Sequence, residues 1–126
     1  MKDNVIRHET RVKDTGEVFT PDPLVQKMLD DLNVDWNNPP LDKSFLDPTC
    51  GNGQFLIELV KRGIPLENIY GVDLMPDNIN SCRERVLEAD NLSNLSNPSN
   101  PTPNAKEIIE KNIVQGDALT FDYKFN

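Results

Sequence analysis

The feature that most constrains the fold is the segment 47–55, which reads Asp-Pro-Thr-Cys-Gly-Asn-Gly-Gln-Phe and lies between a short apolar run and a helix-like stretch. A strand that leads through Gly51 and Gly53 into a helix is typical of a nucleotide-binding loop, because glycine permits a sharp turn and close approach of a ligand. An ordinary strand-to-helix turn has the same pattern, and a pair of glycines does not distinguish the two. Asp47 ends the strand, where open α/β sheets bind ligands, and its carboxylate favours a cationic group over a diphosphate.

The remainder of the chain alternates helices with strands. An amphipathic helix is predicted over residues 21–32, with Thr20 as its N-cap, Pro21 at its first position and an inward face of Leu24, Val25, Met28, Leu29 and Leu32. Strands are predicted at 44–47, 68–73 and within 112–119, and helices at 56–62, 76–89 and 105–111. This alternation predicts an α/β fold with a parallel sheet and crossover helices.

Length and composition limit the possible functions. The 126 residues allow one domain with a small core, and the net charge of −8 argues against binding of a phosphate backbone by this chain alone. Cys50 and Cys82 have neither metal-site spacing nor the pattern of a disulfide framework, so we expect no metal and a reducing, cytoplasmic location. The sequence contains no apolar signal region and no apolar run of membrane-spanning length, so we expect no membrane association.

The sequence also suggests how the domain is organised. Residues 1–15 form a polar N-terminal segment, and residues 16–126 form the ligand-binding domain. Within it, residues 91–103 are rich in Asn and Ser and contain three prolines. Such a tract has too few large apolar side chains to offset the entropy of ordering, so we expect a disordered loop insertion.

Three aspartates follow the three predicted strands: Asp47, Asp73 and Asp117. In a parallel sheet these positions share one edge, so the carboxylates and the glycine loop should face a common crevice. Asp73 follows Gly51 by 22 residues, a spacing at which a carboxylate binds a ribose, which points to an adenosine ligand. A nicotinamide dinucleotide is less favoured, because its fingerprint requires glycine or alanine where this chain has Leu56, and because Asp47 would repel the pyrophosphate. S-adenosylmethionine meets both objections, since its amino and sulfonium groups are cationic and it has no phosphate.

Four segments, in chain order, resemble motifs of the S-adenosylmethionine-dependent adenine-N6 DNA methyltransferases of restriction-modification systems and phages: residues 16–21, 47–55, 71–74 and 116–119. The resemblance implies a Rossmann-like class I methyltransferase fold and S-adenosylmethionine as cofactor. It implies that residues 16–21 surround the methionine part, Asp73 binds the ribose, Leu74 lies against the adenine, and Asp117 binds the adenine amino group. The full set of implied cofactor-binding residues is Phe19, Thr20, Pro21, Asp47, Pro48, Cys50, Gly51, Gly53, Phe55, Asp73, Leu74, Asp117 and Ala118.

One motif of that family has no counterpart here. The family's catalytic motif, an Asn or Asp followed by two prolines and an aromatic residue, follows a fourth strand, whereas this chain stops at Asn126. The segment 38–41, Asn-Pro-Pro-Leu, lacks the aromatic residue and precedes the first strand, so it is interpreted as a proline turn. We therefore expect a fold truncated after its third strand, with no catalytic residue in this chain.

These observations lead to one preferred function and two alternatives. The chain is predicted to be the cofactor-binding part of a methyltransferase that methylates the exocyclic amine of a flipped-out adenine, and to need further chain or a partner subunit for catalysis. DNA would then be the substrate of the complete enzyme and would bind this chain weakly or not at all. The alternatives are a noncatalytic S-adenosylmethionine-binding module for regulation or assembly and, less favoured, a dinucleotide-binding oxidoreductase domain.

Overall fold

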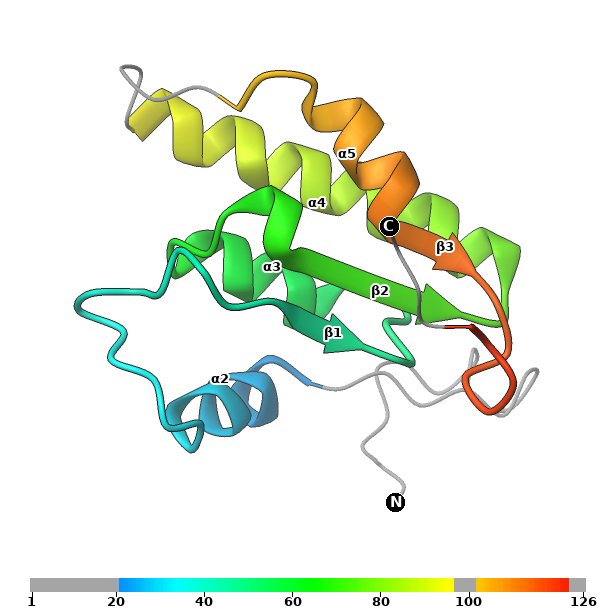
Figure 1. Cartoon of the computed structure of the whole chain (residues 1–126), viewed down its shortest axis with the longest axis horizontal. Coiled ribbons are helices and arrows are strands. Elements are labelled where there is room, and N and C mark those ends of the chain that lie inside the picture. The colour runs from blue at the N-terminus through cyan, green and yellow to red at the C-terminus, as the bar shows by residue number, and fades with distance from the viewer. Residues whose placement is uncertain (1–20, 97–101, 123–126) are drawn as a thin grey trace. The chain divides into compact units, whose positions relative to one another are not determined.

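A computed structural model describes residues 21–96 and 102–122 of the chain (Figure 1). The chain divides into two compact units, Met1–Val34 and Asp35–Asn126. The described part of the first unit contains helix α2 (Asp22–Asp30). The described part of the second contains strands β1 (Phe45–Asp47), β2 (Ile69–Asp73) and β3 (Ile113–Gln115), helices α3 (Gln54–Lys61), α4 (Pro76–Ser96) and α5 (Ala105–Asn112), and the short 3-10 helix η1 (Leu66–Asn68).

The strands of the second unit form a parallel sheet in the order β1-β2-β3. Leu46 of β1 lies opposite Tyr70, and Val72 of β2 lies opposite Val114. Helix α3 connects β1 to β2, while α4 and α5 connect β2 to β3, so all three strands end at the same edge (Figure 1). The predicted α/β class, with a parallel sheet and flanking helices as in a Rossmann-like methyltransferase, is confirmed.

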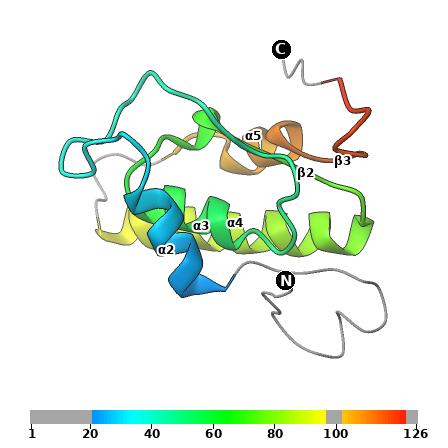
Figure 2. The same ribbon diagram turned by 90° about the horizontal axis from the view of Figure 1, so that it is seen from below.

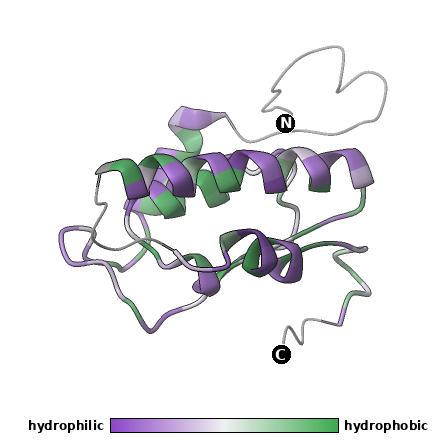
Figure 3. Cartoon of the chain, turned by 90° about the horizontal axis from the view of Figure 1, so that it is seen from above, coloured by the Kyte–Doolittle hydropathy of each residue, from purple (hydrophilic) through white to green (hydrophobic). Residues whose placement is uncertain are grey.

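Helices α3 and α4 lie together on one face of this sheet (Figure 2). The core beneath them contains side chains that are almost fully buried: Leu56, Leu59, Ile69, Val72, Cys82 and Val86. Along α4, Ile79, Cys82 and Val86 recur at helical spacing, and hydrophobic and hydrophilic segments alternate along the helix in Figure 3. These three residues belong to the predicted inward stripe of the helix.

Helix α2 begins one residue later than predicted. Pro21 is the N-cap and forms no side-chain capping bond, and Asp22 is the first helical residue, while Thr20 lies outside the described residues. Val25 and Leu29 are fully buried, whereas the other three predicted core residues of this helix are about two-fifths exposed: Leu24, Met28 and Leu32. The predicted apolar face was too wide, because five apolar residues span a broader arc than the helix buries.

The prediction of a loop from residue 91 was wrong for its first part, because α4 continues to Ser96. Asp90, which is 6% exposed, accepts a hydrogen bond from Asn94 one turn later at 3.3 Å and another from the Thr102 hydroxyl at 3.0 Å. These bonds stabilise the helical continuation and anchor the chain that leads into α5. Residues 97–101, and the predicted domain boundary at residue 15, lie outside the described residues.

Strand β3 is shorter than predicted. It ends at Gln115, so Asp117 lies two residues beyond the strand, in a turn, rather than at its end. In the described part of the chain, no helix combines the length and apolar character needed to cross a membrane.

Candidate functional site

The turn that follows β1 is held by backbone hydrogen bonds. The N–H of Cys50 donates to the Val72 carbonyl of β2 at 2.8 Å, which extends the pairing of the two strands by one bond. The N–H of Gly53 donates to the Cys50 carbonyl at 2.8 Å and closes the turn. Gly51 and Gly53 have φ values of 54° and 89°, in the left-handed region where residues with a Cβ are strained. The backbone conformation of the turn therefore requires glycine at both positions.

Gly53 is also the N-cap of α3 and lies directly against α4. A Cβ at position 53 would lie 2.8 Å from the Cys82 sulfur and 3.3 Å from the Cys82 Cα. A similar approach occurs at Gly71 of β2, where a Cβ would lie 2.8 Å from a Leu56 methyl group. The loop, the strand and the two helices pack so closely that these glycines leave no room for a side chain.

Asp73, at the end of β2, binds the glycine loop and the segment that enters α4. Its Oδ2 accepts a hydrogen bond from the Gly51 N–H at 2.8 Å. Its Oδ1 accepts bonds from the Met75 N–H at 2.9 Å and from the Asn78 amide at 3.1 Å. A carboxylate has about four acceptor positions, so the protein already uses most of those on Asp73. This leaves room for one ligand hydroxyl.

Asp117 belongs to a turn that is attached to the same edge of the sheet. The N–H of Gly116 donates to the Asp73 carbonyl at 2.9 Å, and the Phe121 ring lies against Gly116, where a Cβ would overlap it. The Asp117 carboxylate is exposed and accepts a hydrogen bond from the Leu119 N–H at 2.9 Å. The turn therefore presents the Asp117 carboxylate to solvent next to the end of β2.

The edge of the sheet is electrostatically negative. Burial raises the pKa of Asp47 above its ordinary value, and the neighbouring Asp73 carboxylate raises it further, while a hydrogen bond from the Thr49 N–H opposes the change. The pKa of Cys50 is strongly raised by its hydrogen bond with the Cys82 thiol and by burial, so this thiol stays protonated. Two close carboxylates with a protonated thiol favour a cationic ligand and disfavour a phosphate.

The structure thus joins four of the predicted site residues by hydrogen bonds, in the pairs Gly51–Asp73 and Gly53–Cys50. Asp47 interacts electrostatically with Asp73 and Cys50. The other predicted residues of the second unit flank them: Pro48 before the turn, Phe55 in the first turn of α3, Leu74 after β2 with 62% exposure, and Asp117 and Ala118 after β3. Pro21 belongs to the first unit, and Phe19 and Thr20 lie outside the described residues.

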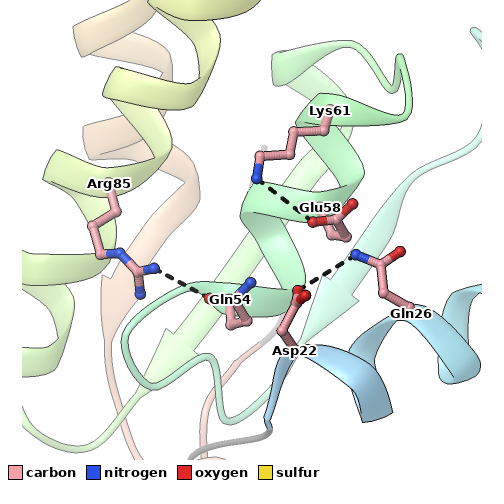
Figure 4. Close-up of polar contacts among 6 residues, drawn as sticks. All are labelled: Asp22, Gln26, Gln54, Glu58, Lys61 and Arg85. Atoms are coloured by element: carbon pink, nitrogen blue, oxygen red, sulfur yellow. Dashed lines mark hydrogen bonds and ion pairs between the residues drawn. The ribbon is translucent and has the colours of Figure 1, made fainter.

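Two residues at this edge were missed by the sequence analysis. Asn78 binds the Asp73 carboxylate, and the Arg85 guanidinium reaches from α4 to the loop and the start of α3 (Figure 4). Arg85 follows Cys82 by three residues, so both lie on one side of the helix. The signal available in the sequence was this spacing, once α4 is taken to pack against the glycine loop.

A separate groove of about 310 Å³ lies between α4 and α5. Charged side chains of both signs line it around an apolar floor: Arg83, Glu84, Lys106 and Glu110, with Leu87 and Ile109. It shares no lining residue with the glycine loop or the three aspartates. Within the described ranges, no cluster of three or more His, Cys, Asp or Glu side chains could hold a metal ion.

Comparison with known proteins finds that the chain is similar to methyltransferases. The family model described as N-6 DNA Methylase matches residues 6–90. The chain is 38% identical over 73 residues to the Type II methyltransferase M.VspI of Vibrio sp. (strain 343), and 34% identical over 73 residues to the Modification methylase CviBIII of Paramecium bursaria Chlorella virus NC1A. It is also 38% identical over 81 residues to the EEF1A lysine methyltransferase 2 of Mus musculus.

Each match covers a larger share of this chain than of the relative. They include 58% of this chain for M.VspI and for CviBIII and 64% for the lysine methyltransferase, but 17%, 19% and 31%, respectively, of M.VspI, CviBIII and the mouse protein. The matched part therefore spans less than a third of each of these relatives. No solved structure gives a significant match to the chain.

Proposed function

Because the chain belongs to the N-6 DNA methylase family, we propose that it is the S-adenosylmethionine-binding part of a methyltransferase that methylates the exocyclic amine of adenine in DNA. The observation that carries the proposal is the negative edge of the sheet, where Asp47 and Asp73 lie beside a turn that contains two glycines in the left-handed region. This arrangement offers carboxylates to a cationic adenosine derivative and a close backbone approach.

The residues of this edge suit S-adenosylmethionine better than a dinucleotide. The donor carries a sulfonium and an amino group, and both are attracted by carboxylates. A nicotinamide dinucleotide carries a pyrophosphate, which Asp47 would repel, and α3 presents buried Leu56 where the dinucleotide fingerprint requires a glycine or alanine. Asp73 retains acceptor capacity for one ribose hydroxyl in addition to its bonds within the protein.

The similarity to a lysine methyltransferase bears on the substrate. Relatives named as a Type II methyltransferase and as a lysine methyltransferase match 58% and 64% of the chain, so similarity to these relatives supports methyl transfer without selecting the acceptor. The choice of adenine as acceptor rests on the family model and on the order of the four sequence motifs.

The position of segment 38–41 supports the proposal that this segment is not the catalytic motif. The residues that act on the adenine amine would then lie outside the described part of the chain. The Leu41 carbonyl accepts a hydrogen bond from Asn68 at the amino end of β2, and Pro39 packs against Gly63 after α3. These contacts hold the segment at the amino end of the sheet, away from the glycine loop at the carboxyl end. We propose that further chain or a partner subunit supplies the catalytic motif, and that the noncatalytic module is the alternative if none does.

The biological setting follows from the same proposal. DNA is then the substrate of the complete enzyme, and the chain acts in the cytoplasm.

Calorimetric titration of the chain with S-adenosylmethionine, S-adenosylhomocysteine and NAD tests the proposed cofactor. We expect binding of the two adenosyl compounds, with S-adenosylmethionine favoured because its sulfonium is charged, and no binding of NAD. A ligand that binds only the folded state also raises its melting temperature, which provides an independent readout. Binding of NAD with no response to the adenosyl compounds would overturn the proposal in favour of the dinucleotide alternative.

A further inference from the structure

One side of α4 forms the support for the glycine loop. Cys82 and Arg85 are three residues apart and lie on the same side of the helix. Cys82 contacts the loop sterically, because a Cβ at Gly53 would come within 2.8 Å of its sulfur. Arg85 donates hydrogen bonds to the residues on either side of Gly53, which are Asn52 and Gln54, so Cys82 and Arg85 hold the same turn.

The Arg85 guanidinium joins the loop to the first residue of α3. Its Nη1 donates to the Asn52 carbonyl at 3.1 Å. Its Nη2 donates to Oε1 of Gln54 at 3.1 Å, the bond drawn in Figure 4. Arg85 is half-buried and, among the described residues, forms these two hydrogen bonds and no ion pair. Bonds from a charged donor are stronger than those between neutral groups.

The loop needs an anchor outside itself because of its composition. Asn52 lies between Gly51 and Gly53, and glycine restricts the backbone less than any other residue, so the local sequence does not select one loop shape. The amide of Gly51 is held by Asp73, and that of Gly53 by the Cys50 carbonyl. The Asn52 carbonyl is held from α4, by Arg85.

We propose that Arg85 is a positioning residue for the methyl-donor site, which fixes the Asn52 carbonyl and the start of α3 so that the loop has its binding shape before the ligand arrives. This inference rests on the proposed function. A loop that is already ordered loses less conformational entropy on binding, so removal of Arg85 should weaken donor affinity without removal of any group that contacts the donor.

Arg83 provides a matched control on the same helix. Its Nε donates to the Ile113 carbonyl at 2.8 Å, and its Nη2 donates to the Glu110 carbonyl at 3.2 Å. It therefore also makes two hydrogen bonds from a guanidinium, but to the junction of α5 and β3 and not to the glycine loop. Loss of Arg83 should affect stability in a similar way, with no direct effect on the loop.

The experiment compares Arg85→Met with Arg83→Met in the full 126-residue chain. Affinity for S-adenosylhomocysteine is measured by calorimetry at a temperature at which both variants are folded, and loop order by hydrogen exchange of the amides of residues 51–54. We expect Arg85→Met to weaken affinity by about tenfold and to speed exchange in the loop, while Arg83→Met changes affinity by less than about twofold. Arg85→Lys keeps a charged donor that can reach one of the two acceptors, so it should recover part of the affinity.

Equal losses of affinity in the two Met variants would overturn the inference, because the losses would then reflect general stability alone. No loss in either variant would also overturn it, because Arg85 would then make no contribution to donor affinity. If Arg85→Met does not fold, the comparison is made between Arg85→Lys and Arg83→Lys with the same criteria. If the unmodified chain binds neither adenosyl compound, the proposed function fails, and loop exchange alone decides the positioning role. Faster exchange in the Arg85 variant than in the Arg83 variant would support that role, and equal exchange would contradict it.

Discussion

At the scale of single residues, the aspartates that end β1 and β2 have different surroundings. Asp73 accepts three hydrogen bonds from the protein and so shapes the glycine loop in addition to any contact with a ligand. Asp47 accepts one bond from the following turn, and its burial beside Asp73 makes its negative charge unfavourable. A bound cation would relieve that unfavourable charge, so Asp47 is the residue whose ionisation should respond most to the donor.

The first prediction concerns the pH dependence of donor binding. Because the pKa of Asp47 is raised in the folded chain, its carboxyl is neutral at low pH and becomes charged only as the pH rises through that raised value. Affinity for S-adenosylmethionine should therefore increase over this range. The stability of the unliganded chain should decrease over it, because the folded state favours the neutral form of Asp47, which is lost as the pH rises from the ordinary pKa of the group to the raised one. Calorimetry and melting curves from about pH 4 to pH 8 measure both effects.

The isosteric variant Asp47→Asn is the control for this prediction. It keeps an oxygen that can accept the bond from the Thr49 N–H but cannot ionise. We expect it to bind the donor about tenfold more weakly at pH 8, as for loss of one charged partner, and to lose most of the pH dependence. An unchanged pH profile in this variant would show that another group is responsible.

At the scale of the elements, the glycine loop and the aspartates that end β1 and β2 were located correctly, because their signals are local, whereas Asp117 lies two residues beyond the end of β3. The turn after β1 needs two residues with positive φ, and glycine at positions 51 and 53 supplies them. The extent of α4 was predicted poorly, because residues 91–96 have a loop-like composition and their helical state depends on contacts of Asp90, one of them with Thr102 twelve residues later.

A second prediction follows from this extension of α4. Asn91 is exposed and lies in the helix interior, so its replacement tests helical state with little change in packing. Asn91→Gly should be less stable than Asn91→Ala by about 1 kcal/mol, the usual difference between the two residues in a helix. Chemical denaturation of the two variants measures this difference. Equal stabilities would mean that residue 91 lies in a loop, as predicted from the sequence.

At the scale of the whole molecule, the chain carries a net charge of −8 and its second unit presents an acidic edge. Affinity for DNA that does not depend on sequence comes mainly from lysine and arginine, so we expect this chain to bind a duplex weakly. For the proposed reaction, the adenine base must also be flipped out of the duplex, and its exocyclic amine must be held in line with the methyl group before transfer. We therefore expect the complete enzyme to meet both requirements with residues outside the described part of this chain.

The third prediction is that the purified chain binds the methyl donor but does not transfer the methyl group. In an assay with tritiated S-adenosylmethionine and mixed-sequence duplex DNA, incorporation should not exceed that of an Asp73→Asn variant, which loses an acceptor for the Gly51 N–H. A DNA-binding assay at low salt on the same samples should show weak or no retention. Incorporation clearly above that control would refute the prediction and would place a catalytic group within residues 1–126.

The sequence by itself determined the α/β alternation, the parallel sheet, the glycine turn and the acidic character of the site, because each depends on neighbours within a few residues or on a fixed spacing along the chain. Tertiary structure decided which groups hold that turn. Asp73 binds Gly51 across 22 residues and Arg85 binds Asn52 across 33, contacts that exist only once β2 and α4 pack beside the loop. Such long-range hydrogen bonds depend on helix orientation and burial, which local patterns do not encode.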